Sequence, residues 1–242
     1  WAAQAQSHLS AYRKQRAPLH TDTKILTSWN GLMIAAMARA GFVFNEPRYL
    51  EAARRAQRFI QEHLTTATGR LLLRWSDGEA KYAGQLDDYA FYGLALLALY
   101  ETTWEPSYLQ QAVTTSHWLL RLFADEAQGG FFLYAHDSEA LITRPKEAYD
   151  GALPSGNAAA ALLLTRLAHL TADEFWRQAA DQQLGYLTGA LKRYPAGSAY
   201  ALLAMLETLS PAPVLIITTR EAALSAETQS LLRTSAQPLT IL

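Results

Sequence analysis

The chain has no cysteine among its 242 residues, which excludes disulfides, thiolate metal ligands and Cys-x-x-Cys redox chemistry within it. It also lacks a long hydrophobic run. The longest strongly apolar stretch, Tyr89 to Tyr100, falls well short of the roughly 20 residues that a membrane-spanning helix needs. No basic segment followed by an apolar one opens the chain, so no signal peptide is indicated. We therefore expect no membrane partner and a cytoplasmic location.

An excess of charge is missing as well. Lys and Arg number 21 and Asp and Glu 22, for a formal net charge of -1, and the basic residues are scattered along the chain. Such a chain presents no basic field to a phosphate backbone, which argues against a nucleic-acid partner. Its histidines and acids show no metal-ligand spacing and there is no glycine-rich phosphate loop, so we expect no metal and no cofactor.

Half of the residues are hydrophobic, and their spacing predicts helices of two alternating kinds. One kind is apolar on nearly every side and needs neighbours all round, whereas the other carries a single apolar stripe and a polar face. The fully apolar helices are expected at 32–40, 90–99, 158–170 and 199–209, with Gly41 ending the first. The amphipathic ones are expected at 48–63, 108–123 and 174–192. Each inner helix would thus be followed by an outer one.

Helical hairpins of this kind fit two concentric rings, so the predicted fold is an all-α, α/α toroid over residues 1–210. Short β-hairpins are expected at 69–78 and 129–134, between helix pairs. Residues 211–242 predict a small β-α-β appendage that is cut off at the chain end. The helix at 1–16 begins in mid-pattern without a cap, so we expect an incomplete ring, completed by upstream sequence or by a second copy.

Each fully apolar helix follows a polar junction, and the residues Asn30, Asp88, Ser155 and Ser198 mark the four junctions. If the inner helices run parallel, these junctions lie at one end of the molecule. Helix N-termini present unpaired N–H groups and a partial positive charge, which suits oxygen-rich or anionic ligands. Aromatic residues beside them, such as Trp29 and Tyr149, could stack on sugar rings.

Three segments together resemble a known family: TDTKILTSWNGLM at 21–33, LDDYA at 86–90 and DGALPSGN at 150–157. They are similar to the spermatogenesis-associated protein 20 family, known in bacteria as YyaL-type thioredoxin-domain proteins, and the resemblance covers most of the chain. It implies a toroid resembling six-hairpin glycosidases and N-acylglucosamine 2-epimerases, preceded in the family by a thioredoxin-like domain that would be a partner of this region. Thr23 departs from the pattern, since the family tends to a second acid after Asp22, which weakens any acid pair there.

Three acids are candidates for catalysis: Asp87, Asp88 and Asp150. Glycoside hydrolysis commonly uses two carboxylates across the scissile bond, and Asp150 could face one member of the Asp87-Asp88 pair. Each acid also has an ordinary structural interpretation. One of the pair could cap the helix that follows, and an Asp before Gly is a common turn residue. His20, the only histidine close to a junction, could act as an acid or base or lie on the surface.

Six further residues are candidates for ligand binding: Trp29, Asn30, Tyr89, Tyr149, Ser155 and Asn157. Ser155 fits a helix cap better than a nucleophile, because no Gly-x-Ser-x-Gly elbow surrounds it. Two functions therefore stay open. One is an enzyme that acts on a carbohydrate by acid-base chemistry, and the other is a non-catalytic module that binds a glycan or peptide or scaffolds the thioredoxin-like domain.

Overall fold

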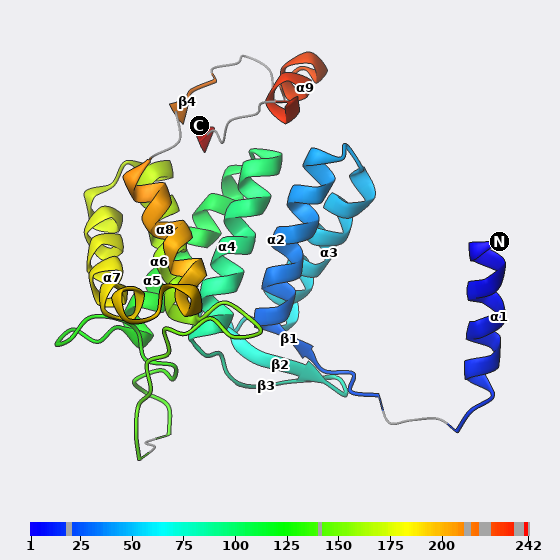
Figure 1. The fold of residues 1–242 in the computed structure, drawn as a ribbon, viewed down its shortest axis with the longest axis horizontal. Coiled ribbons are helices and arrows are strands. Elements are labelled where there is room, and N and C mark those ends of the chain that lie inside the picture. The colour runs from blue at the N-terminus through cyan, green and yellow to red at the C-terminus, as the bar shows by residue number, and fades with distance from the viewer. Residues whose placement is uncertain (18–20, 140–141, 211–213, 218–223, 235–239, 242) are drawn as a thin grey trace.

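The computed structural model describes the chain apart from residues 18–20, 140–141, 211–213, 218–223, 235–239 and 242. The first helix, α1 (Ala2–Lys14), contains no buried residue and stands apart from the other helices (Figure 1). It therefore adds nothing to the core, although the sequence predicts a helix there that belongs to the toroid. Within the described parts of the chain, none of the helices has the length and apolarity that crossing a bilayer requires.

Three helical hairpins and one further helix form the body of the protein. The hairpins are α2 (Thr27–Val43) with α3 (Pro47–His63), α4 (Leu86–Thr103) with α5 (Pro106–Phe123), and α6 (Gly156–Thr171) with α7 (Glu174–Arg193), followed by the short η1 (Pro195–Ser198) and α8 (Ala199–Leu209). Two outer helices, α3 and α5, start with proline, whose fixed φ suits the first helical position. The inner helices contact one another in series, from α2 through α4 and α6 to α8.

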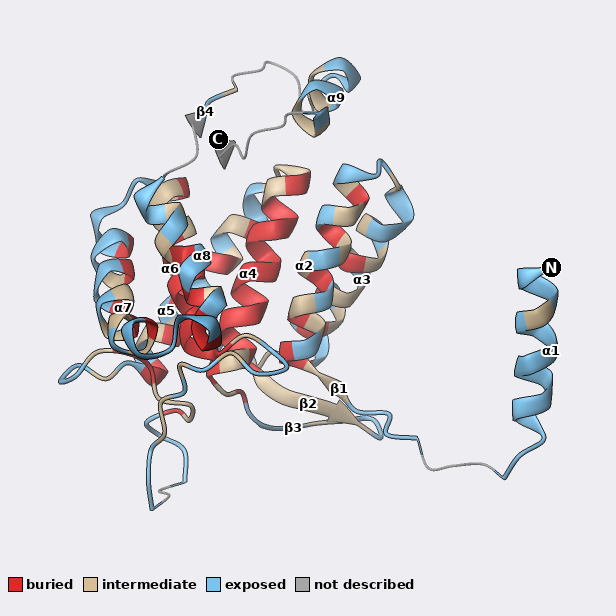
Figure 2. Ribbon diagram, in the orientation of Figure 1, coloured by how far each residue is buried: buried red, intermediate tan, exposed pale blue. Residues whose placement is uncertain are grey.

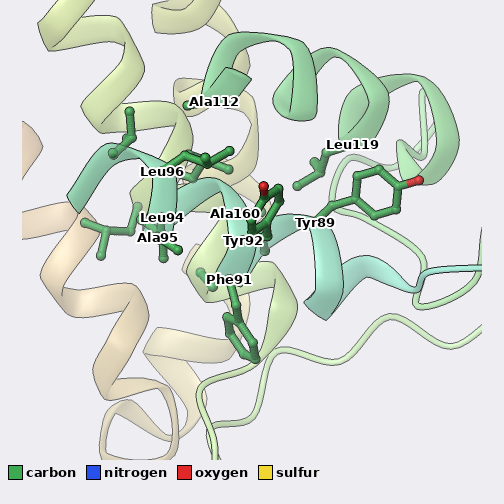
Figure 3. Close-up of a cluster of buried hydrophobic side chains, with 14 of the residues drawn as sticks. Tyr89, Phe91, Tyr92, Leu94, Ala95, Leu96, Ala112, Leu119 and Ala160 are labelled. Atoms are coloured by element: carbon green, nitrogen blue, oxygen red, sulfur yellow. The ribbon is translucent and has the colours of Figure 1, made fainter. Parts of the chain in front are cut away.

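The core lies around α4 and α6, which are buried along almost their whole length (Figure 2). Side chains of α4 such as Tyr89, Phe91 and Leu96 pack inside it, and Leu119 of α5 and Ala160 of α6 lie in the same cluster (Figure 3). These two helices are the ones with neighbours on every side. The alternation of fully apolar and amphipathic helices in the sequence thus predicts the two layers correctly.

The helices at the two ends of the series, α2 and α8, are less covered. Val43 of α2 and Leu206 and Leu209 of α8 are exposed, so these apolar helices lack the full set of neighbours that their composition calls for. The ranges predicted for the first two inner helices are too short, because α2 runs from Thr27 through Gly41 to Val43 and α4 runs from Leu86 to Thr103. The glycine serves close packing instead: a Cβ there would lie 2.8 Å from the backbone nitrogen of Leu50 in α3.

A small antiparallel sheet lies below α2 and α4, at the end of the body where the inner helices begin (Figure 1). Its strands are β1 (Ile25–Leu26), β2 (Leu72–Ser76) and β3 (Glu79–Ala83), and Asp77-Gly78 forms the turn of the predicted hairpin. The second predicted hairpin is absent from the described loop at 124–139, where Phe131 makes only an isolated bridge to Ala124. At the C-terminal end, β4 (Val214–Leu215) and β5 (Thr240–Ile241) pair in parallel around α9 (Ala226–Thr234), as the β-α-β prediction requires.

Candidate functional site

The inner helices α2, α4, α6 and α8 all begin at the lower end of the body in Figure 1, so their N-termini form one surface. We call it the helix-start face. Asn30 and Asp88 lie in the first turns of α2 and α4, Ser155 is the N-cap of α6, and Ser198 ends η1 just before α8. The four junctions therefore meet at the same end, as a toroid of parallel inner helices demands.

Asp88 is fully buried and both of its carboxylate oxygens are used by backbone N–H groups. Oδ1 accepts a hydrogen bond of 2.9 Å from the N–H of Ser28 in α2, and Oδ2 accepts one of 2.8 Å from Gln85, with which Asp88 forms a capping box. Burial raises the pKa of Asp88 to about 7, outweighing these hydrogen bonds, which act to lower it. The geometry gives Asp88 a capping role that joins two inner helices.

Asp150 performs a similar task at the other end of the series. Its Oδ1 accepts from the N–H of Ser155 at 2.8 Å, and its Oδ2 accepts from the N–H of Tyr200 in the first turn of α8 at 2.7 Å. The carboxylate therefore bonds within its own turn and across to a neighbouring helix. Asp88 and Asp150 do not form the facing pair of catalytic carboxylates considered above, because both oxygens of each side chain bond backbone N–H groups.

Asp87 is only partly buried, as Asp150 is, whereas Asp88 is fully buried. The carboxylate of Asp87 accepts from the N–H of Gly156 at the start of α6, and a Cβ at that glycine would lie 2.2 Å from Asp87 Oδ1. Burial first and the charge of Glu147 second raise the pKa of Asp87 to about 6. Glu147 is exposed and belongs to the loop before α6, so this acid pair spans two hairpins.

The three aspartates together serve the N-termini of all four inner helices. Asp88 serves α2 and α4, Asp87 serves α6, and Asp150 serves α6 and α8. Carboxylates at these positions complement the partial positive charge of each helix start. At the start of each inner helix at least one backbone N–H is thus already partnered by a carboxylate of the protein, which weakens these N-termini as sites for an anionic ligand.

Three of the predicted ligand-binding residues are buried and engaged inside the protein. Tyr89 packs against Phe123 and its hydroxyl accepts from the N–H of Leu71 at 2.9 Å. Ser155 caps α6 by accepting from Ala158, as its cap interpretation predicts. The amide of Asn157 bonds both backbone groups of Phe131 as well as further partners. These three side chains lie beneath the helix-start face and bond other parts of the protein, so they are not available to contact a ligand.

The other three predicted ligand-binding residues reach the surface. Trp29 and Tyr149 are 61% and 63% exposed, and Asn30 is partly exposed, with its amide donating to the carbonyl of Leu26. Sequence reasoning missed Tyr194, which stacks on Tyr149, although the junction Tyr194-Pro195 before α8 gave a signal for it. It also missed Glu147, for which the sequence carries no local signal.

His20 lies outside the described residues, and nothing follows from the structure about its role. Among the residues that are described, no three His, Cys, Asp or Glu side chains gather in a way that could hold a metal ion. Among the described residues, the helix-start face offers the partly buried carboxyl groups of Asp87 and Asp150, the exposed side chain of Glu147 and several exposed aromatic rings.

Solved structures of carbohydrate-active proteins share this fold. A family 76 glycoside hydrolase from a bovine Bacteroides thetaiotaomicron strain matches 68% of the chain and 35% of its own length, with a TM-score of 0.58 and 19% identity. Cellobiose 2-epimerase from Bacillus thermoamylovorans matches 69% of the chain and 45% of its own, with a TM-score of 0.58 and 16% identity. By its fold the chain is an α/α toroid of the six-hairpin glycosidase-like class.

Sequence comparison then identifies the relatives. The chain is a homologue of spermatogenesis-associated protein 20: the human protein is 33% identical over 208 residues, which are 82% of the chain. An uncharacterised Caenorhabditis elegans protein, B0495.5, is 32% identical over 180 residues, or 70% of the chain. The matches span 26% and 24% of the length of these two relatives. No family model matches the chain.

Proposed function

We propose that this chain is a carbohydrate-binding toroid that takes a neutral glycan on its helix-start face. The observation that carries the proposal is that the partly exposed Asp87 and the exposed Glu147 lie close enough for their charges to interact, on a face that also carries exposed rings. Exposed aromatic side chains, Trp29 and Tyr149, belong to the same face. Carboxyl groups that accept hydroxyl hydrogen bonds, next to aromatic rings that cover apolar C–H groups, are the combination that suits a sugar.

The fold supports the same ligand class. The neighbours are described as glycoside hydrolases of family 76 and as cellobiose 2-epimerases, so proteins with this architecture act on sugars. Their likeness extends to the fold, and the ligand of this chain is our proposal. Asp87, Asp88 and Asp150 already accept from individual N–H groups at the helix starts, so side chains would make the main contacts with a glycan.

A second candidate function is acid-base action on the bound glycan, with Asp87 as proton donor and Glu147 as the partner carboxylate. With a pKa of about 6, Asp87 would hold its proton in about one molecule in ten at pH 7, whereas an ordinary aspartate would hold it in about one in a thousand. Asp87-Asp88 is also a pair of consecutive aspartates, and a fold neighbour, an α-1,6-mannanase, is described as inactive when two consecutive aspartates are replaced by asparagine. Since Asp88 is committed to capping, Asp87 would carry the proton transfer.

The test is a binding titration of α-1,6-mannotriose and cellobiose followed by NMR chemical shifts, with the parent chain, Asp87→Asn, Trp29→Ala and the control Asp181→Asn. Asp181 is an exposed aspartate on the outer helix α7, away from the proposed site. We expect the parent and the control to bind alike and the two site variants to bind about tenfold more weakly, the loss of one good contact. If the parent binds no sugar of the panel, the proposal is wrong.

The same samples separate the two candidate functions. Incubation of the parent with each sugar and analysis of the products by chromatography would reveal hydrolysis or epimerisation. Turnover by the parent that disappears in Asp87→Asn, while Asp87→Asn still binds the sugar, supports acid-base chemistry. Binding without turnover supports the binding module.

A further inference from the structure

Two tyrosines that are distant in sequence stack on each other at the helix-start face. The rings of Tyr149 and Tyr194 are nearly parallel, at 8°, with their centroids 6.4 Å apart. Both stay more than half exposed, at 63% and 57%. Gly197 lies against the two rings, since a Cβ there would come within 2.4 Å of Tyr194 and 2.6 Å of Tyr149. The pair thus keeps aromatic ring surface exposed on the outside of the protein.

The backbone holds this pair in place from several directions. The N–H of Asp150, next to Tyr149, donates to the carbonyl of Gly197 at 2.7 Å, and the N–H of Gly197 donates to the carbonyl of Tyr194 at 3.1 Å. The carboxylate of Asp150 adds its bonds to Ser155 and Tyr200, which fix the loop to α6 and α8. A surface held in this way loses little conformational entropy when a ligand binds.

The loop also links the aromatic pair to the acids of the site. Along residues 147–150 the exposure alternates: Glu147 and Tyr149 are exposed, while Ala148 and Asp150 are partly buried. Glu147 thus lies two residues before Tyr149, and both side chains face solvent. Glu147 is close enough for its charge to act on Asp87, so the loop that carries Tyr149 also carries one member of the acid pair.

We propose that Tyr149 and Tyr194 form a sugar-stacking platform, on which one hexopyranose ring of a neutral glycan lies with its apolar C–H face. The platform rests on the proposed function and defines a subsite for it. The rings supply the apolar contact and the phenol hydroxyls can hydrogen-bond to sugar hydroxyls. Glu147 lies on the loop that carries Tyr149, so the subsite selects neutral sugars and repels those that carry a carboxylate.

The test compares Tyr149→Ala, Tyr194→Ala and Tyr149→Phe with the parent in the sugar titration. Tyr82→Ala is the matched control, because Tyr82 is 61% exposed and belongs to β3 of the adjacent sheet. We expect each platform alanine to weaken binding about tenfold, while Tyr149→Phe, which keeps the ring, stays within about threefold and Tyr82→Ala matches the parent. Thermal melting of every variant verifies that the fold is retained.

A further variant and a charged ligand test the position of the two rings and the preference for neutral sugars separately. Gly197→Ala introduces a Cβ against both rings, so it should displace the platform and weaken binding without removing either tyrosine. A disaccharide with one uronic acid should bind about tenfold more weakly than its neutral counterpart in the parent, and the difference should shrink in Glu147→Gln.

The two proposals fail in different ways. If the parent binds a neutral sugar and both platform alanines bind it as tightly, the platform is wrong and the proposed function stands. If the parent binds none, the proposed function fails and the platform with it. If the parent binds the disaccharide with a uronic acid as tightly as its neutral counterpart, the proposal that the subsite selects neutral sugars is wrong.

Discussion

The carboxylate of Asp88 in α4 accepts a hydrogen bond of 2.9 Å from the backbone N–H of Ser28 in α2, across 60 residues of sequence. The contact is buried, and the other oxygen of Asp88 is bonded to Gln85 in its own capping box. One side chain thus completes the N-termini of two neighbouring inner helices. Within the Asp87-Asp88 pair, Asp88 is therefore bonded on both oxygens inside the protein, whereas Asp87 is partly exposed and bonds the N–H of Gly156.

We predict that Asp88→Asn destabilises the protein by about 2 to 3 kcal/mol. Asparagine keeps the shape of the side chain, but its NH₂ group cannot accept a hydrogen bond, so the N–H of Ser28 or of Gln85 loses its partner in a buried place. Urea unfolding of the variant measures the loss. Asp181→Asn on the exposed face of α7 is the control and should change the free energy of unfolding by less than about 0.5 kcal/mol.

The pH dependence of stability should carry the signature of Asp87. Its pKa is raised to about 6 in the folded protein, above the value of about 3.9 in an unfolded chain. The folded state therefore binds more protons than the unfolded state between about pH 4 and pH 6. The contribution of this group to stability is complete below about pH 4 and falls as the pH rises through the folded-state pKa.

The measurement compares the free energies of unfolding of the parent and Asp87→Asn at pH 4 and pH 7.5. Asparagine does not titrate, so the parent should lose on the order of 2 to 3 kcal/mol relative to the variant over this range. Other acids titrate in both proteins and cancel in the difference. An unchanged difference between the two pH values would mean that the pKa of Asp87 is not raised.

Two glycine-to-alanine changes should have opposite effects. At Gly31 of α2 a Cβ would lie 2.8 Å from the carbonyl carbon of Phe91, where the backbones of α2 and α4 approach each other. Because backbone cannot move aside as a side chain can, Gly31→Ala should cost about 2 to 3 kcal/mol. Gly185 of α7 has nothing within 4 Å, so Gly185→Ala should stabilise the protein by about 0.5 to 1 kcal/mol. Thermal or urea unfolding of both variants measures these changes in the free energy of unfolding.

Asn157→Ala should lower stability by about 3 kcal/mol or more. Its amide bonds the N–H and the carbonyl of Phe131, the carbonyl of Glu147 and the side chain of Gln183, and removal leaves several of these buried groups without a partner. Gln178→Ala, on the exposed side of α7, is the control. Loss of sugar binding without any loss of stability would show instead that Asn157 contacts the ligand.

The fold could be predicted from the sequence because hydrophobic periodicity reports directly on burial. The residues of α4 and α6 are apolar on every side, and these helices are indeed buried on every side. The C-terminal boundary of α2 could not be predicted in this way. A glycine usually marks a helix terminus, but Gly41 is needed for the close approach of α3, which no local pattern reveals.

The site could be predicted only in part, for a related reason. The sequence identifies Asp87, Asp88 and Asp150 as junction residues, but what each carboxylate bonds to is decided by long-range contacts, such as that between Asp150 and Tyr200. Whether a side chain faces solvent or a backbone group in the next hairpin cannot be read from its neighbours. The pairing of Tyr149 with Tyr194 is hidden for the same reason.

The sequence separation between Ser28 and Asp88 also bears on how the chain is made. A ribosome adding about 5 to 20 residues per second needs several seconds to produce the 60 residues between the start of α2 and its acceptor. The start of α6 and that of α8 meet carboxylates, Asp87 and Asp150, that have already been synthesised. During synthesis the N–H of Ser28 in the α2–α3 hairpin therefore has no protein acceptor until Asp88 of α4 has emerged, and until then it bonds to water.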